Sequence, residues 1–265
     1  MISYCIACYR PVYSRCLIEE LIRKTTVPYE ILLWLNVVDA EFEAFLEELA
    51  RGGAPVRVAG RSPENIGMAA YPALFDAARF EMVAQIDDDV VCVSPGIGQR
   101  AKAIFDRFPQ IGMLAADVWQ DQYTNGARPP MSGYREVNRD FGLYAGPIDG
   151  WFAVYRKASL AMFRGLRPGR YYPLGCAIRK RLQSVGQSGL LCTRIKVFHV
   201  IGPAYASYFD MLDLEIAKYA ALGRQEIVNW YQAERERLPE RDELRRHVEH
   251  IRESLERAPD GPIGY

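Results

Sequence analysis

The feature that most constrains this chain is the heptapeptide QIDDDVV at residues 85–91, where three consecutive aspartates stand between apolar residues. The preceding residues 82–86 have the composition of a buried strand. Neighbouring carboxylates repel one another, and their burial without compensation is costly. The fold must therefore either expose these aspartates, as in a solvated acidic turn or a helix cap, or supply cations for them.

A divalent cation is the compensation that fits the pattern best. If the chain is still extended here, Asp87 and Asp89 point to one side and Asp88 points to the other. Mg²⁺ and Mn²⁺ accept one or two carboxylates and keep positions open for phosphate oxygens. The pattern therefore predicts a Mn²⁺ or Mg²⁺ site that includes Asp87 and Asp89, with a nucleotide diphosphate bound behind the cation.

The composition excludes several other classes of partner. The chain has 265 residues, 33 basic and 33 acidic side chains, and thus no net basic field for nucleic acid or an anionic membrane. No apolar run approaches the roughly 18 residues of a membrane helix, and the first residues lack the features of a signal peptide. We therefore expect a cytoplasmic protein without a transmembrane segment or a nucleic-acid partner.

Strand-like and helix-like patterns alternate along the first ~115 residues, which predicts an α/β sheet. Ligands of such sheets gather beyond the carboxyl ends of the strands, where the three aspartates stand. Strands are predicted at residues 2–8, 30–38, 56–59, 82–86, 111–115, 151–155 and 191–200. Helices are predicted after Ser14 as N-cap and at residues 41–50, 65–78, 99–108 and 177–185.

The later part of the chain suggests an extension to this domain. Residues 119–147 are rich in Gly, Pro, Asn and Arg and predict a long loop, which either closes over a ligand or is a solvated surface loop. We expect one α/β domain at residues 1–205 and a helical C-terminal extension at residues 206–265. In this extension, an apolar stripe either packs back on the domain or forms a homodimer seam; its residues are Leu244, Val248, Ile251 and Leu255.

Three segments resemble the family-2 nucleotide-sugar glycosyltransferases, which have the GT-A fold. They are ISYCIACYR at residues 2–10, PENIG at residues 63–67 and AQIDDDVV at residues 84–91, and the likeness extends from residue 2 to about residue 200. The resemblance implies a Rossmann-like mixed sheet flanked by helices. It also implies a hexosyltransferase-type enzyme that takes a sugar from a UDP- or GDP-linked donor to a hydroxyl acceptor.

The family implies roles for the matching acidic positions. Asp87 and Asp88 belong to the nucleotide site, with Asp87 near the ribose or a metal-bound water, and Asp89 coordinates the cation directly. His199 follows the apolar run IKVF and corresponds to a histidine that completes the metal shell in several such enzymes. The alternative for His199 is a hydrogen-bonded core histidine.

The same resemblance points to residues around the base of the nucleotide. Asn36 corresponds to the position that meets the base, although the usual acidic residue is absent there, and Asp39 could substitute for it. Tyr9 either stacks on the base or is an ordinary aromatic residue at a strand end. Asn65 either contacts the nucleotide or, with Gly67, makes a turn that leads into a helix.

The general base is where the sequence departs from the family. An inverting transfer needs a group that takes the proton of the acceptor hydroxyl, and the family supplies an Asp in a Glu-Asp pair. Residues 171–182 contain no acid. Asp149 is the relocated candidate, with Trp151 as a platform for the acceptor, although Asp149 next to Gly150 could equally be a turn residue. A retaining mechanism stays open.

Two other functions remain as alternatives. A sugar-phosphate nucleotidyltransferase would need a glycine-rich basic loop after the first strand, and that segment reads CYRPVYSR without glycine. A non-catalytic nucleotide-sugar-binding protein would explain the missing Glu-Asp pair. The three aspartates argue against this second alternative, because buried like charges would be costly without a bound ion.

Overall fold

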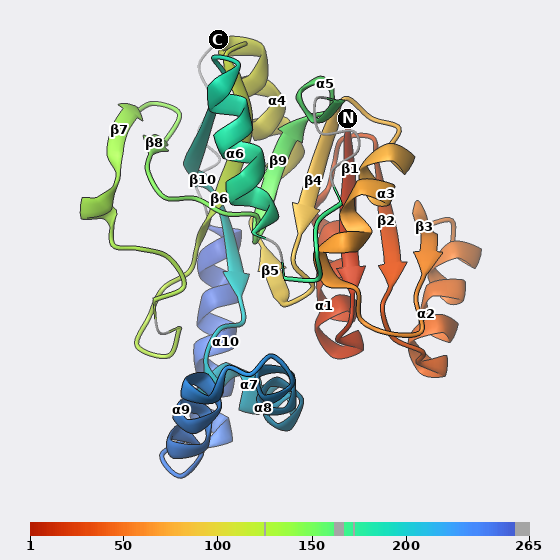
Figure 1. The fold of residues 1–265 in the computed structure, drawn as a ribbon, viewed down its shortest axis with the longest axis vertical. Helices are drawn as coiled ribbons and strands as arrows, with labels where there is room; N and C mark the ends of the chain where they lie inside the picture. Colours follow the sequence, from red (N-terminus) through yellow and green to blue (C-terminus); the bar gives the residue numbers. More distant parts are fainter. Residues whose placement is uncertain (125, 162–166, 172, 258–265) are drawn as a thin grey trace.

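A mixed β-sheet forms the centre of the protein (Figure 1) in the computed structural model, which describes residues 1–124, 126–161, 167–171 and 173–257. Within these residues the strand order is β3-β2-β1-β4-β9-β6-β10-β8-β7, and β5 pairs with β10. The strands are β1 (Ile2–Cys8), β2 (Tyr29–Leu35), β3 (Val56–Arg61), β4 (Met82–Ile86), β5 (Val90–Val93), β6 (Ile111–Val118), β7 (Arg135–Asn138), β8 (Leu143–Ala145), β9 (Phe152–Arg156) and β10 (Ser188–His199). This arrangement confirms the predicted α/β class with a mixed sheet.

The first four strands of the chain are parallel, so their carboxyl ends lie at one edge of the sheet. They are linked by the helices α1 (Pro11–Lys24), α2 (Ala40–Arg51) and α3 (Tyr71–Ala77), the last preceded by the 3₁₀ turn η1 (Gly67–Ala70). In register, Ile6 of β1 pairs with Ile86 of β4, and Cys8 pairs with Leu35 of β2. The residues that follow β1, β2 and β4 therefore share one edge.

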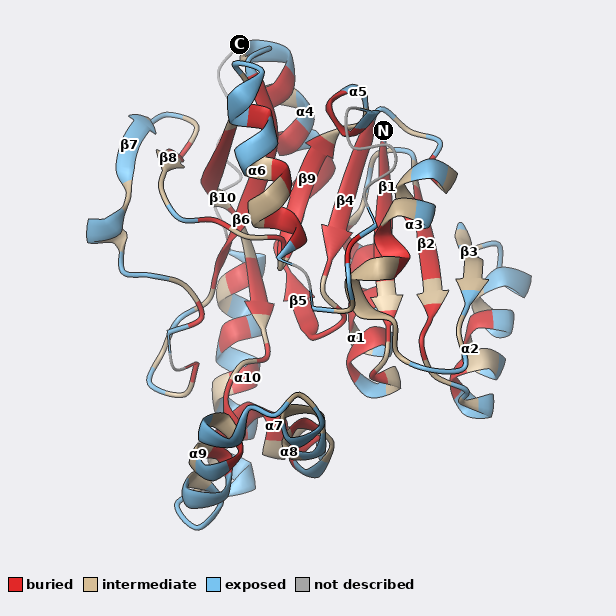
Figure 2. Ribbon diagram, in the orientation of Figure 1, coloured by how far each residue is buried: buried red, intermediate tan, exposed pale blue. Residues whose placement is uncertain are grey.

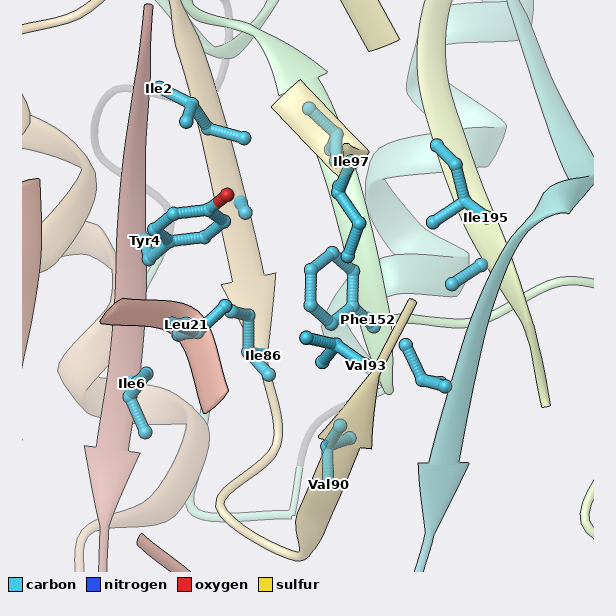
Figure 3. Close-up of a cluster of buried hydrophobic side chains, with 14 of the residues drawn as sticks. Ile2, Tyr4, Ile6, Leu21, Ile86, Val90, Val93, Ile97, Phe152 and Ile195 are labelled. Carbon is cyan, nitrogen blue, oxygen red and sulfur yellow. The ribbon is translucent and has the colours of Figure 1, made fainter. Parts of the chain in front are cut away.

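Helices cover both faces of the sheet, and two separate apolar clusters fill the space between the layers. The cluster in Figure 3 joins alternate residues of β1, such as Ile2 and Tyr4, to α1, α2 and α4 (Ile97–Arg107). Cys5 faces the opposite cluster, which is formed with α3 and α6 (Leu174–Ser184). Figure 2 shows the central strands buried along their length, as expected for a sheet covered on both faces.

The C-terminal helices are α7 (Pro203–Tyr208), α8 (Leu212–Ala221), α9 (Gln225–Arg235) and α10 (Arg241–Glu256). The apolar stripe of α10 is buried against Val91 of β5, Phe198 of β10 and Tyr13 of α1. The stripe thus packs within the chain, which is one of the two expected uses. In Figure 1, α7, α8 and α9 gather beyond the edge at which β1 and β4 end. The predicted domain boundary near residue 205 falls within α7.

Three details differ from the sequence-based expectations. Ser14 is not an N-cap, because α1 already begins at Pro11, where the fixed φ of proline suits the first helical turn. The strand β5 was not predicted, since the aspartates end the apolar run of β4. Residues 119–147 are not a bare loop: they contain β7, β8 and the 3₁₀ turn η2 (Met131–Gly133). A short helix, α5 (Lys157–Leu160), follows β9.

No helix in the described part of the chain has both the length and the apolar character needed to cross a bilayer.

The packing of α10 predicts the effect of a substitution in its stripe. Ile251 is 1% exposed, so Ile251→Ala should leave a cavity and lower the free energy of unfolding by about 2–5 kcal/mol. Urea denaturation measures this change. Arg246→Ala, at an exposed position of the same helix, is the control and should stay within about 0.5 kcal/mol. Equal stability of the two variants would contradict the packing described here.

Candidate functional site

The three aspartates stand in a tight turn that joins β4 to β5. The Asp87 N–H donates to the Trp151 carbonyl at 2.9 Å, and the Val90 N–H donates to the Asp87 carbonyl at 3.1 Å. The chain is therefore not extended at these residues, as the sequence-based argument had assumed. The turn nevertheless divides the side chains as expected, with Asp87 and Asp89 in one cluster and Asp88 in another.

His199 reaches this turn from the end of β10. This strand pairs antiparallel with β5, and a register shift between Phe198 and His199 sets His199 opposite Val90. The Val200 N–H donates to the Asp89 carbonyl at 2.8 Å. His199 Nε2 lies 2.8 Å from Asp89 Oδ1, and each of these two side chains is 12% exposed. A histidine that the sequence places about 110 residues away is thereby fixed beside the aspartates.

Asp87, Asp89 and His199 form a cluster that fits a divalent cation. One ligand atom from each residue lies within 4.8 Å of the others. Two buried polar atoms of the cluster, Asp87 Oδ1 and His199 Nδ1, have no hydrogen-bond partner among the described residues. Such unpaired atoms are costly in a folded protein unless a ligand satisfies them. Two carboxylates and an imidazole are also a donor set that suits Mn²⁺.

The electrostatics of the cluster show which carboxylate lacks compensation. Burial, and then the charge of Asp89, raise the pKa of Asp87 to about 8. Burial also acts to raise the pKa of Asp89, but Arg10 and His199 outweigh it and hold that pKa below its usual value. Burial acts to lower the pKa of His199, and the adjacent Asp89 reverses this and raises it. Among the described residues Asp87 forms no ion pair, and the opposing charges of His199 and Arg10 do not outweigh its burial and the charge of Asp89.

Asp88 is compensated by Arg10, which follows β1. Asp88 Oδ2 accepts the N–H groups of Tyr9 and Arg10 at 2.8 and 2.7 Å, and Asp88 Oδ1 accepts Arg10 Nε at 3.1 Å and Arg10 Nη2. Both side chains are less than 10% exposed. Asp88, which the resemblance assigned to the nucleotide site, therefore ties the carboxyl ends of β1 and β4 together.

Arg10 also links the aspartates to the C-terminal helices. Its Nη1 lies 2.8 Å from Asp89 Oδ2 and 2.6 Å from Glu215 Oε1 of α8. Glu215 in turn pairs with Lys218. Sequence reasoning missed all three of these residues. Arg10 could have been found from its place after β1, at the same edge as the aspartates, but no local pattern marks Glu215 or Lys218.

A cavity of about 370 Å³ opens beside this cluster. Of the residues predicted for the site, six line it: Tyr9, Asn65, Asp87, Asp88, Asp89 and His199. Residues that were not predicted also line it, among them Arg10, Arg170, Glu215, Lys218, Tyr219 and Tyr231. The cavity thus combines the edge of the sheet with one wall from α8 and α9.

Asn36 and Asp39 are not among the described residues that line the cavity. Asn36 Oδ1 accepts the Ile66 N–H at 3.2 Å, and Asp39 accepts the Phe42 N–H at 2.8 Å as the N-cap of α2. Both side-chain oxygens therefore make local structural hydrogen bonds. The amide nitrogen of Asn36 is buried and has no partner in the described chain.

Asp149 and Trp151 lie close to the turn but do not line the cavity. Asp149 Oδ1 accepts the N–H groups of Gly150 and Cys176 at 2.8 and 3.1 Å, so it holds the first turn of α6. Trp151 Nε1 donates to the Ala116 carbonyl at 2.8 Å. Burial raises the pKa of Tyr155, with further contributions from the charges of Asp149 and Asp87.

The turn after Asn65 requires glycine and brings Arg170 to the cavity. Asn65 Oδ1 accepts the Gly67 N–H at 2.8 Å, and Gly67 has φ +53°. A Cβ at Gly67 would lie 2.2 Å from the Arg170 carbonyl, which accepts the Met68 N–H at 3.0 Å. A side chain at residue 67 would therefore separate the two segments that meet here.

Comparison with solved structures places this architecture among known folds. TarS 1–349 from S. aureus, solved in complex with UDP-GlcNAc, is similar with a TM-score of 0.56 and 15% identity over 82% of this chain. The mannosyltransferase PcManGT from Pyrobaculum calidifontis, solved with GDP-Man and Mn²⁺, gives 0.56 and 15% over 84%. GalNAc-T7, solved with UDP, GalNAc and Mn²⁺, gives 0.58 and 14% over 76%. All three are GT-A glycosyltransferases. The chain has the GT-A fold.

At these identities, the likeness establishes the fold and not the activity. The match covers 64% of the TarS 1–349 chain, 64% of PcManGT and 44% of GalNAc-T7. No family model matches this sequence, and no curated protein matches it. The chemistry of the site must therefore be argued from its own residues.

The pairing of Asp88 with Arg10 predicts a large loss of stability when one partner is removed. Asp88→Ala would leave a buried guanidinium with one fewer carboxylate and should lower the free energy of unfolding by about 3–5 kcal/mol. Urea denaturation measures the loss. Asp242→Ala breaks an exposed pair with Arg245 and should cost no more than about 1 kcal/mol. A loss of that size for Asp88→Ala would contradict the structural role of this pair.

Proposed function

We propose that this protein is a metal-dependent glycosyltransferase that moves a sugar from a nucleotide-diphosphate sugar to a hydroxyl acceptor. The observation that carries the proposal is the cluster of Asp87, Asp89 and His199 on the wall of the cavity, at the carboxyl ends of β1 and β4. In this fold, ligands bind beyond such strand ends. The Mn²⁺ in the PcManGT and GalNAc-T7 structures supports the same reading.

The residues of the cluster would hold Mn²⁺ or Mg²⁺, with Mn²⁺ favoured by the imidazole donor. When bound, such an ion neutralises charge on the departing nucleotide diphosphate. Asp87 would give up the proton that its raised pKa lets it keep near neutral pH. Asp89 is already ionised through its contacts with Arg10 and His199. Asp89 would therefore bind the cation without losing a proton, whereas Asp87 would release a proton when the cation binds.

The nucleotide sugar would occupy the cavity between the aspartate turn and α8. Tyr9 and Asn65 line this space, and they are the predicted contacts with the nucleotide. Arg170 and Lys218 add positive charge to the same wall and suit phosphate oxygens. Complexes of the similar structures with UDP-GlcNAc and GDP-Man favour a UDP- or GDP-linked donor.

The acceptor side of the proposal rests on Asp149 as general base and Trp151 as a platform, in an inverting transfer. Trp151 directly precedes β9 and contacts Asp87 through the backbone, so the acceptor would approach next to the cation turn. Asp149 has a second carboxylate oxygen besides the one that accepts from Gly150 and Cys176. That oxygen is the group proposed to take the proton of the acceptor hydroxyl.

A thermal-shift panel of UDP, GDP and their sugars, with and without Mn²⁺, tests donor binding. A ligand at about 100 times its Kd stabilises the folded protein by about 2.7 kcal/mol, which raises Tm measurably. We expect a Mn²⁺-dependent rise with one nucleotide diphosphate, and Asp89→Ala should abolish it. Asp76→Asn, at an exposed position of α3, should behave as wild type. Equal binding of the nucleotide with and without Mn²⁺ would contradict the proposal.

Asp149→Asn tests the acceptor side. As general base, Asp149 should contribute roughly 10²–10⁴-fold to transfer, so the variant should lose that factor while its Mn²⁺-dependent nucleotide binding is retained. Release of UDP or GDP in the presence of candidate acceptors measures turnover. Tm reports whether the loss of the hydrogen bond between Asp149 and the first turn of α6 destabilises the variant. Unchanged turnover would remove Asp149 from the mechanism.

The same assays separate the alternatives. A nucleotidyltransferase would release pyrophosphate from a nucleoside triphosphate rather than UDP or GDP from a sugar donor. A binding protein would show the Mn²⁺-dependent rise in Tm but no release of sugar with any acceptor tested.

A further inference from the structure

Arg10 is shared between the cation cluster and the C-terminal helices. Its guanidinium contacts Asp88 through Nε and Nη2, while its Nη1 lies between Asp89 Oδ2 at 2.8 Å and Glu215 Oε1 at 2.6 Å. The Arg10 side chain is 9% exposed. The N–H donors of the planar guanidinium have fixed directions. The position of Glu215 therefore affects the orientation in which Arg10 Nη1 contacts Asp89.

Glu215 is itself firmly held. It lies on α8, is 5% exposed and pairs with Lys218 one helical turn later. It does not belong to the group whose ligand atoms converge within 4.8 Å, which in the described chain consists of Asp87, Asp89 and His199. Among the described residues, the ion pairs that join Glu215 to Asp89 run through Arg10.

The charges of the whole cluster balance a divalent cation. With its carboxylates ionised and His199 neutral, the group joined by these ion pairs and by the cation cluster holds four acids (Asp87, Asp88, Asp89, Glu215) and two bases (Arg10, Lys218), which leaves two negative charges. Arg170 lines the same cavity but is not part of this group. If Glu215 were absent, the aspartates would be the only carboxylate partners of Arg10 in the described chain. Its positive charge would then compete with a bound cation for Asp89.

We propose that Glu215 is a positioning residue for the cation site: it holds the Arg10 guanidinium at α8, so that Arg10 orients Asp89 without displacing the cation. The inference rests on the proposed function, because it assumes that Asp87, Asp89 and His199 hold a divalent ion. It assigns a role to the C-terminal helices, which complete the electrostatics of a site whose proposed ligands come from the β4–β5 turn and from the end of β10.

Calorimetric titration of Mn²⁺ into the full-length, nucleotide-free protein tests the inference. Two variants separate charge from position. Glu215→Gln removes the negative charge and keeps the shape, whereas Glu215→Asp keeps the charge and withdraws it from Arg10 by one methylene. We expect each to weaken Mn²⁺ binding by about 10–100-fold, the range found for residues that support metal ligands from outside the coordination shell. Far-UV circular dichroism and Tm without Mn²⁺ report whether each variant is folded.

The matched control is Asp213→Asn, which removes one carboxylate from the same helix at a position that is 84% exposed and pairs with Arg235. Its Mn²⁺ affinity should equal that of the wild type. Wild-type affinity in Glu215→Asp would show that only charge matters and would overturn the positioning role, as would wild-type affinity in both variants. If one variant fails to fold, the other decides: weakened Mn²⁺ binding supports the inference, and wild-type affinity overturns it.

These outcomes are distinct from a failure of the proposed function. A wild-type protein that binds no Mn²⁺ would remove the cation site and the inference together. Mn²⁺ binding that is insensitive to Glu215 would remove the inference alone and leave the sugar-transfer assays unaffected.

Discussion

The repulsion among the carboxylates of residues 87–89 is the constraint on which the rest of this structure depends. The turn that carries them is mostly buried, and the negative charge of each aspartate is compensated in a different way or to a different degree. Asp88 is neutralised by Arg10, and Asp89 lies between Arg10 and His199. Asp87 has no ion-pair partner among the described residues, and burial together with the charge of Asp89 raises its pKa. A cation at this point would relieve the repulsion, which explains why a stable fold retains so costly a feature.

This constraint accounts for contacts between distant parts of the chain. The ends of β1 and β4 are held together through Asp88, and the end of β10 is fixed by the backbone of Asp89. Glu215 then brings α8 to the same point. The apolar packing of α10 on β5 and β10 supports that placement from behind the turn. The C-terminal helices therefore contribute both to the core and to the wall of the cavity.

The parts of the site that could be predicted from sequence have local signals. An apolar strand followed by aspartates indicated where the acidic cluster lies, and the apolar run before His199 indicated a second strand end. Gly67 was recognisable as a turn residue, and its φ of +53° agrees. The expected division of the aspartate side chains was right, although a turn and not an extended strand produces it.

The remainder could not be predicted, because it depends on tertiary neighbours. Asn36 and Asp39 follow a strand end, yet their oxygens are used by the backbone of nearby turns and helices. Asp149 likewise bonds the start of α6. Glu215 and Lys218 look like ordinary charged residues of an amphipathic helix until α8 is placed against Arg10.

Manganese-edge anomalous diffraction from a crystal soaked with Mn²⁺ and the preferred nucleotide diphosphate tests the central claim most directly. The account predicts one strong peak within coordination distance of Asp87, Asp89 and His199, and also in contact with the diphosphate oxygens. A nucleotide bound in the cavity with no anomalous peak beside these residues would contradict it.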